Sequence, residues 1–257
     1  MTQIVSIHSY RGGTGKSNLS ANLAVTQALL GKHVALVDTD IQSPGINVLF
    51  GLSDEKIKNT LNDYLWGKCE IKDATYNLSY VLQDALSREA SSAGNLYLIP
   101  SSMKSEDIAR VLSEGYDVEL LQEGFYEISE RLNLDYLFID THPGINEETL
   151  LCVGISNTPV LILRPDQQDY LGTAVVLEVA ENLEVPQILL VLNKVLPELD
   201  FDALRQKVEE TYHQSVAGIL PLSTEMLRLG SQGIFCLRHP DHRVTAEFKS
   251  IVSHIQA

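Results

Sequence analysis

A glycine-rich segment near the start of the chain has the residue types and spacing of a phosphate-binding loop. The run Arg11-Gly12-Gly13-Thr14-Gly15-Lys16-Ser17 follows a short β-branched stretch and leads into a good helix-forming sequence. Glycines can adopt positive φ and lack a Cβ, so consecutive backbone N–H groups can converge on phosphate oxygens. The helix that begins near Lys16 adds the positive end of its dipole. Lys16 is then placed to bridge the β- and γ-phosphates, and Ser17 to offer its hydroxyl to Mg²⁺.

This segment predicts a nucleotide site in which Lys16 also serves catalysis. We expect the residues that contact the nucleotide here to be Gly12, Gly13, Thr14, Gly15, Lys16, Ser17 and Asn18. The usual pattern has a further glycine five residues before Gly15, where this chain has Tyr10. The alternative is a strand-to-helix turn that binds nothing. The coincidence of strand, glycine loop, Gly-Lys-Ser and helix favours the nucleotide site.

Carboxylates follow two apolar runs that have the character of buried strands. Asp38 and Asp40 come after residues 33–37, and Asp140 comes after residues 136–139. The carboxyl ends of parallel strands form the ligand edge of an α/β sheet. Asp140 could orient the metal or its water shell, or could instead cap the next helix. We favour Asp38, which is closer to its strand, for positioning the attacking water near Mg²⁺, with Asp40 as a loop cap.

Apolar strand runs alternate with helical stretches along the rest of the chain. We predict strands near residues 4–8, 33–37, 96–100, 134–139, 159–163, 187–192 and 216–220. We predict helices near residues 16–30, 54–66, 105–112, 118–132, 169–182, 201–212 and 245–255, with a surface excursion over residues 87–94. This alternation implies a single α/β domain over residues 1–257. Its sheet should be doubly wound, mainly parallel and flanked by helices, as in P-loop NTPases.

The composition is that of an ordinary globular protein, with 44% hydrophobic and 21% charged residues among 257. No run reaches the roughly 18 to 20 apolar residues of a membrane span. The chain enters a strand without a signal peptide, which predicts a cytoplasmic protein. Cys69, Cys152 and Cys236 are widely spaced, so we expect buried reduced thiols rather than a disulfide framework or a metal site.

The net charge of −15 argues against a protein whose whole surface binds nucleic acid. The segment 226–257 is locally basic, however. Its firm charges are Arg228, Arg238, Arg243 and Lys249 against Asp241 and Glu247. These side chains form either a binding surface or the solvated face of a terminal helix.

An apolar stripe recurs at helical spacing in the last predicted helix. Its members are Phe248, Ile251, Val252 and Ile255. A membrane-binding helix would need basic residues beside such a stripe, and only Lys249 adds firm positive charge. We therefore interpret the stripe as facing the core, which makes a membrane partner an unfavoured alternative.

Four motifs together resemble the ParA/MinD family of deviant Walker-A ATPases. They are the run from Arg11 to Ser17, Asp38-Thr39-Asp40 with Gln42 and Pro44, Asp140-Thr141-His142-Pro143-Gly144, and Pro165-Asp166-Gln167-Gln168-Asp169-Tyr170. The matches follow the family's order from Ile4 to about Pro221. In that family, ATP held between two subunits makes a dimer. The dimer binds nucleoid DNA or membrane, and a partner protein stimulates slow hydrolysis and release.

The resemblance implies an ATP-dependent switch that positions cargo inside a bacterial cell, with ATP and Mg²⁺ as cofactors. It implies that Lys16 and Ser17 bind phosphate and Mg²⁺. It further implies that Asp38 serves hydrolysis near the metal and that Asp140 supports the metal site. Asn193 would contact the adenine, and Pro221 would belong to the same nucleotide site.

Position 11 departs from the family pattern. The family usually has a signature lysine immediately before the two glycines, which reaches the phosphates of the other subunit, and this chain has Arg11. Arginine keeps the charge and adds a planar fork suited to phosphate. We expect Arg11 to act in catalysis across the dimer, the alternative being a surface arginine. The carboxysome-positioning McdA branch also lacks the loop lysine, but no residue here identifies the cargo.

The leading prediction is a homodimeric, nucleoid-associated positioning ATPase whose basic C-terminal residues bind DNA non-specifically. Arg228, Arg238 and Arg243 are the candidates for neutralising DNA phosphates. The alternatives are a MinD-like membrane-associated ATPase, a P-loop metabolic ligase, and a scaffold that binds nucleotide without turnover. A ligase should show a second catalytic constellation, which we do not find. The residues retained at the predicted site argue against an inactive scaffold.

Overall fold

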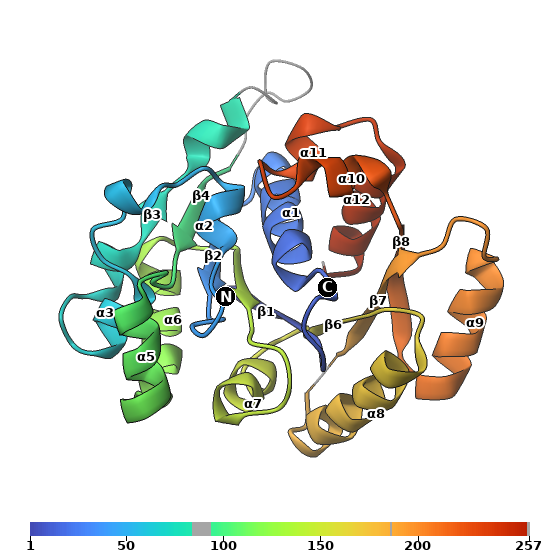
Figure 1. Cartoon of the computed structure of the whole chain (residues 1–257), viewed down its shortest axis with the longest axis horizontal. Helices are drawn as coiled ribbons and strands as arrows, with labels where there is room; N and C mark the ends of the chain where they lie inside the picture. Colours follow the sequence, from blue (N-terminus) through green and yellow to red (C-terminus); the bar gives the residue numbers. More distant parts are fainter. Residues whose placement is uncertain (84–93, 186, 256–257) are drawn as a thin grey trace.

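The computed structural model describes residues 1–83, 94–185 and 187–255, and its strands form one sheet (Figure 1). The strands are β1 (Gln3–His8), β2 (Val34–Asp38), β3 (Tyr76–Asn77), β4 (Leu96–Ile99), β5 (Tyr136–Asp140), β6 (Val160–Leu163), β7 (Leu189–Val195) and β8 (Ser215–Pro221). Their order across the sheet is β3-β4-β2-β5-β1-β6-β7-β8. Every neighbouring pair is parallel except β3 and β4, which are antiparallel.

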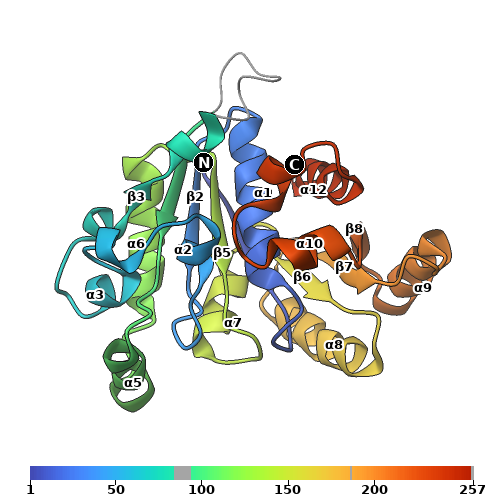
Figure 2. The same cartoon turned by 45° about the horizontal axis from the view of Figure 1, so that its top comes forward.

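Helices cover both faces of this sheet (Figures 1 and 2). The α-helices are α1 (Lys16–Leu29), α2 (Ile46–Leu49), α3 (Leu61–Leu65), α5 (Ser105–Glu114), α6 (Glu119–Arg131), α7 (Glu147–Gly154), α8 (Gln167–Asn182), α9 (Phe201–Tyr212), α10 (Thr224–Leu229), α11 (Phe235–Arg238) and α12 (Arg243–Ile255). The described residues also form the short 3₁₀ helices η1 (Asp54–Lys56), η2 (Ile71–Ala74) and η3 (Ser79–Leu82). Helices α1, α11 and α12 lie on one face, and α6, α7 and α8 lie on the other.

The central strands are apolar on both sides because both faces of the sheet are covered. All five residues of β2 and all five of β5 are buried. The last residues of these two strands, Asp38 and Asp140, are paired in register. The sheet therefore places two carboxylates side by side at its carboxyl edge.

Helix α12 packs its apolar stripe into the core between α1 and the sheet. Phe248, Ile251 and Ile255 are 0% exposed and Val252 is 1% exposed. The predicted core-facing stripe is thus confirmed. None of the helices in the described parts of the chain combines the length and the apolar character that a bilayer crossing requires.

The predicted architecture is confirmed, and most predicted elements are present with ends shifted by one to three residues. The helix predicted over residues 54–66 is wrong. The Tyr76 hydroxyl accepts hydrogen bonds from the backbone N–H groups of Lys58 and Asn59, at 2.8 and 3.0 Å, which holds these residues outside a helix. Helix α3 then starts at Leu61 and is capped by Thr60, whose backbone N–H donates to Asp63 Oδ2 at 3.0 Å.

Two further outcomes concern α7 and the cysteines. Helix α7 was not predicted, although Asn146 caps it and its Oδ1 accepts from the Thr149 N–H at 2.8 Å. The three cysteines are free thiols, and Cys152 and Cys236 are buried, but Cys69 is only partly buried, contrary to the expectation. The excursion predicted over residues 87–94 lies outside the described residues, apart from its last position.

Candidate nucleotide site

The loop between β1 and α1 needs glycine at two of its positions. Gly13 has φ of 78° and Gly15 has φ of 102°, a backbone region that side-chain-bearing residues rarely adopt. A Cβ on Gly15 would also lie 2.6 Å from Asn193 Nδ2. Gly12, in contrast, does not adopt the positive φ that we expected it to be free to adopt. A Cβ at this position would make only an ordinary contact with Pro143.

Lys16 is the first residue of α1 and is buried, with 6% of its surface exposed. The Ser20 side chain donates a hydrogen bond to Asp140 Oδ1 at 2.8 Å, and the Ser17 hydroxyl lies close enough to Asp140 to favour its charged form. The other oxygen of Asp140, Oδ2, is buried and has no hydrogen-bond partner. The sheet and α1 thus bring together Lys16, Ser17 and Asp140, as predicted from their places in the sequence.

These residues fit a hard cation such as Mg²⁺. Mg²⁺ is usually bound through one or two carboxylates, with waters and substrate phosphates completing its shell. The unpartnered Oδ2 of Asp140 next to the Ser17 hydroxyl meets that requirement. Within the described ranges there is no cluster of three or more His, Cys, Asp or Glu side chains that would form an all-protein cage.

Burial raises the pKa of both paired carboxylates. Burial, followed by the charge of Asp140, raises the pKa of Asp38 to about 8. Burial raises the pKa of Asp140 to about 6, although the charge of Lys16 opposes that shift. Without a cation, the pair therefore retains a proton near neutral pH, which a divalent cation at this edge would displace.

Asp38 and Asp40 differ in how much of each carboxylate is free. Asp38 is 1% exposed, and its oxygens accept hydrogen bonds from the backbone N–H groups of Asp40, Gly45 and Ile46 at 3.1 to 3.2 Å. Asp40 is 8% exposed, and its Oδ1 accepts from the Ser43 N–H at 3.1 Å, which is the loop cap that we predicted. The geometry makes Asp38 a fixed carboxylate at the base of the site, with Asp40 nearer the opening.

His142 faces Asp40 from the loop after β5. Its Nε2 lies 3.9 Å from Asp40 Oδ1. Its Nδ1 lies 2.6 Å from the Pro143 carbonyl oxygen, which can only accept, so Nδ1 carries a proton. On the inner side, His8 Nδ1 is 2.7 Å from Thr141 Oγ1, and burial lowers the pKa of His8 to about 3. His8 is therefore neutral and structural, whereas His142 adds a polar ring at the mouth of the site.

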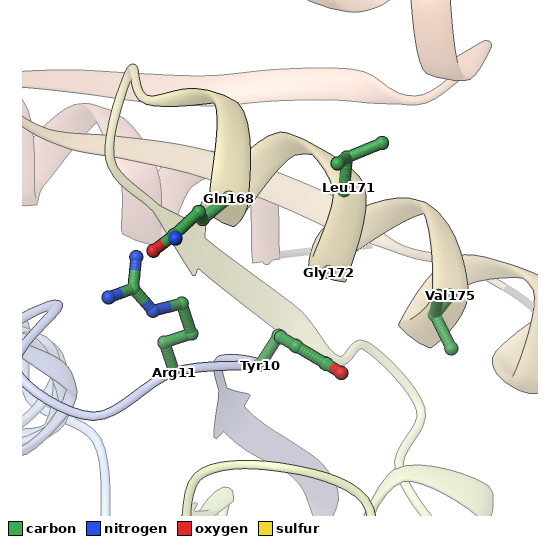
Figure 3. Close-up of a pocket in the computed structure, with 6 residues that line it drawn as sticks. All are labelled: Tyr10, Arg11, Gln168, Leu171, Gly172 and Val175. Atoms are coloured by element: carbon green, nitrogen blue, oxygen red, sulfur yellow. The ribbon is translucent and has the colours of Figure 1, made fainter.

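Arg11 points away from the glycine loop toward α8 (Figure 3). Its Nη1 lies 3.4 Å from Asp169 Oδ1 and 3.6 Å from Asp166 Oδ1. Arg164 binds Asp169 more closely, through Nε to Oδ2 at 2.9 Å and Nη2 to Oδ1 at 3.1 Å. Arg11 is thus the outer arginine of this cluster and is bound less closely than Arg164, with 39% of its side chain exposed.

Tyr10, which stands where the usual pattern has a glycine, packs directly on α8. A Cβ added to Gly172 would lie 2.1 Å from Tyr10 Cδ1, so the glycine makes the notch that receives the ring. Together with Leu171 and Val175, these residues line a cavity of about 410 Å³ beside Arg11 (Figure 3). The phosphate loop is therefore seated on α8 at its outer side.

A second cavity, of about 220 Å³, lies on the other side of the loop. Four of the predicted nucleotide-binding residues meet there: Gly15, Asn18, Asn193 and Pro221. Leu222, Met226 and Leu227 give it an apolar wall. An apolar cleft with a few amide groups, next to a phosphate loop, suits a flat heterocyclic base. The base contact predicted for Asn193 stays a prediction.

Two polar residues near the site were not predicted from the sequence. Glu148 on α7 accepts a hydrogen bond from the Tyr116 hydroxyl, and burial raises the pKa of Glu148 to about 7. No sequence signal marked it, because α7 itself was not recognised. Lys194 donates from Nζ to the Gly13 carbonyl oxygen at 2.7 Å. Its position directly after Asn193 was the only available clue.

The loop with its buried Lys16, at the carboxyl edge of a parallel sheet, places the chain in the class of P-loop nucleotide-binding proteins. More narrowly, the chain belongs to the family described as the CobQ/CobB/MinD/ParA nucleotide binding domain, whose model matches residues 5–234. The resemblance to ParA/MinD proteins is therefore confirmed.

Individual relatives agree with this assignment. The septum site-determining protein MinD of Bacillus subtilis is 27% identical over 264 residues, covering 99% of this chain and 89% of MinD. MinD of Pyrococcus horikoshii, solved in complex with Mg-ADP, has the same fold, with a TM-score of 0.80, 22% identity, and coverage of 100% and 96%. The apo McdA structure from Cyanthece gives a TM-score of 0.73 at 19% identity, with coverage of 98% and 99%.

Proposed function

We propose that this chain is a Mg²⁺-dependent ATPase that dimerises with ATP and positions or partitions intracellular cargo. The observation that carries the proposal is the unpartnered, buried Oδ2 of Asp140 beside Ser17 and the buried Lys16, at the start of a helix that follows a glycine loop. Membership of the nucleotide-binding family supports it.

Each residue of the site has a distinct part in binding. The backbone N–H groups of the loop around Gly13 and Gly15 would hold phosphate oxygens, and the Lys16 ammonium would bridge the β- and γ-phosphates. Ser17 and Asp140 would hold Mg²⁺, directly or through its waters. When bound, the metal neutralises charge that develops on the phosphates. The cavity at Asn193 and Pro221 would take the adenine.

We assign the positioning of the attacking water to Asp38. Its carboxylate is fixed by three backbone N–H groups and lies in register with Asp140. Positioning supplies much of the catalysis in phosphoryl transfer, so a fixed acceptor close to the metal is useful. Asp40, which is nearer the opening, is the competing acceptor, and variants of the two residues separate their roles.

We propose that Arg11 reaches the phosphates of a second subunit. Its guanidinium is exposed and belongs to the loop that binds phosphate, and a planar fork suits bidentate phosphate binding. To reach a second subunit, Arg11 must leave Asp166 and Asp169, which hold it at 3.6 and 3.4 Å. Arg164 stays bound to Asp169 and keeps that buried carboxylate neutralised.

We propose non-specific DNA as the surface that the dimer binds. Arg228, Arg238 and Arg243 belong to α10, α11 and α12, which lie together on one face of the sheet (Figure 1). All three side chains are exposed, and the guanidinium of Arg243 lies over the ring of Phe201, 4.8 Å from its centroid. We also propose that a partner protein stimulates hydrolysis and that carboxysomes are the cargo. A complex of MinC with MinD from Aquifex aeolicus is a solved example of a relative with a protein partner.

A MinD-like membrane ATPase is the second candidate, since MinD proteins are among the relatives. The burial of the α12 stripe disfavours membrane binding through that helix. A metabolic ligase is the third candidate.

Phosphate release from ATP and GTP, measured with and without Mg²⁺, tests the proposed ATPase activity. We expect slow Mg²⁺-dependent release from ATP that Lys16→Ala abolishes. Wild-type release at the level of Lys16→Ala would overturn the proposed activity.

A further inference from the structure

The two residues near the end of β7, Asn193 and Lys194, both reach across to the phosphate loop. Asn193 Nδ2 donates to the Thr14 carbonyl oxygen at 2.7 Å. Lys194 Nζ donates to the Gly13 carbonyl oxygen, also at 2.7 Å. Two consecutive side chains of one strand thus hold two consecutive carbonyl groups of the loop.

The backbone of β7 is shaped to aim these side chains. The pairing of β7 with β8 shifts register between Leu192 and Val195, so the intervening residues form an irregularity of the bulge type. Lys194 has φ of 56°, a left-handed conformation that few residues other than glycine adopt. Asn193 Oδ1 supports it by accepting from the Lys194 backbone N–H at 2.8 Å. Strained backbone of this kind concentrates at functional sites.

Holding a carbonyl group fixes the next N–H group as well. Because the peptide unit is planar and trans, its C=O and N–H point in opposite directions. Lys194, through the Gly13 carbonyl, therefore sets the direction of the Thr14 N–H. Asn193 holds the Thr14 carbonyl and therefore sets the direction of the Gly15 N–H. These N–H groups belong to the loop that would hold the phosphates.

Both side chains also line the 220 Å³ cavity beside Pro221. We propose that Lys194 is a positioning residue that, with Asn193, couples occupation of the base cavity to the shape of the phosphate loop. A base in the cavity touches the same two side chains that orient the phosphate-binding N–H groups. The inference rests on the proposed nucleotide site and deepens it.

Lys194→Gly separates the side chain from the backbone, because glycine adopts the left-handed conformation without strain. Calorimetric titration with ATP, ADP and adenosine would compare it with wild type, Lys194→Arg and the exposed-lysine control Lys207→Ala. We expect Lys194→Gly to bind ATP and ADP about tenfold more weakly than wild type, because the side chain that orients the loop is absent. Its affinity for adenosine should fall by no more than about threefold. Its Tm should be unchanged or higher. Lys194→Arg should restore most of the ATP affinity, and Lys207→Ala should match wild type.

Two results would overturn the inference alone. One is a Lys194→Gly variant that binds ATP as wild type does. The other is an equal loss of affinity for ATP and adenosine, which would make Lys194 a wall of the base cavity and nothing more. A wild-type protein that binds no ATP would instead overturn the proposed function together with the inference.

Discussion

Arg11 Nη1 lies 3.4 Å from Asp169 Oδ1 of its own subunit, although Arg164 already binds both oxygens of that carboxylate. Two arginines therefore share one aspartate, and the inner one makes the shorter contacts. The outer arginine can leave without exposing an unpaired carboxylate, so its release costs little. This arrangement lets a residue of the phosphate loop be held within the monomer and still serve a second subunit.

Arg11→Ala should lower the rate of ATP hydrolysis by about tenfold or more, because the variant lacks the charge proposed to reach the other subunit's phosphates. ATP binding to one subunit should change by less than about threefold, since Arg11 points away from its own loop. Phosphate release and nucleotide titration measure the two effects. Arg110→Ala, which removes an exposed arginine paired with Glu114, is the control. Unchanged hydrolysis in Arg11→Ala would leave Arg11 as a surface arginine.

Asp38→Asn and Asp40→Asn should separate water positioning from loop capping. The first should lower hydrolysis by about 10²-fold or more and keep ATP binding, because it removes the acceptor assigned to the water. The second should lower hydrolysis by less than about tenfold and leave the Tm nearly unchanged, because the asparagine Oδ1 can still accept from the Ser43 N–H. Single-turnover phosphate release measures both variants. The reverse ranking would transfer the water-positioning role to Asp40.

The nucleotide-free protein should be less stable at alkaline than at mildly acidic pH. Burial raises the pKa of Asp38 to about 8 and that of Asp140 to about 6, against about 4 for an unfolded aspartate. The folded state binds more protons in this window, so the free energy of unfolding falls as pH rises from about 4 through about 8. We expect a Tm about 5 °C lower at pH 8.5 than at pH 6, the shift that about 2 kcal/mol produces in a domain of this size.

Asp38→Asn provides the control for that pH dependence, because an amide cannot ionise. Its Tm should vary much less between the two pH values, and Mg²⁺ with nucleotide should raise the wild-type Tm most at pH 8.5. A wild-type Tm that is constant or rises over this range would contradict the assigned shifts.

Gly172→Ala should destabilise the protein by about 1–3 kcal/mol, because the new methyl group collides with the ring of Tyr10. The double variant Tyr10→Gly with Gly172→Ala should recover part of that loss, since the ring is then absent. Urea denaturation of the single and double variants gives the coupling energy. Strict additivity would show that Tyr10 and Gly172 do not pack together in solution.

DNA binding should weaken steeply with salt and require ATP. Replacing Arg228, Arg238 and Arg243 by Ala together should reduce the slope of log affinity against log salt by about 2 to 3, because each arginine that contacts a phosphate contributes about one unit. Fluorescence anisotropy with a labelled duplex measures the slope. Sedimentation with liposomes is the companion assay, and ATP-dependent binding to vesicles without binding to DNA would favour the membrane alternative.

Much of the site followed from the sequence because parallel strands end at one edge. Asp38 and Asp140 could be placed together from two apolar runs alone, and Lys16 from its glycine loop. The helix predicted over residues 54–66 failed because the Tyr76 hydroxyl, far along the chain, captures backbone N–H groups within that range. Lys194 could not be recognised because its contact with the loop depends on an irregularity between two strands.

The ATP-dependent dimer is the central claim, and size-exclusion chromatography with light scattering tests it most directly. Wild type, Asp38→Ala and Arg11→Ala would be run with ADP or ATP, in Mg²⁺, with and without DNA. We predict monomers with ADP and a wild-type dimer with ATP. Asp38→Ala should accumulate a DNA-bound dimer, whereas Arg11→Ala should stay monomeric. Protein that remains monomeric with ATP in wild type and Asp38→Ala alike would contradict the account.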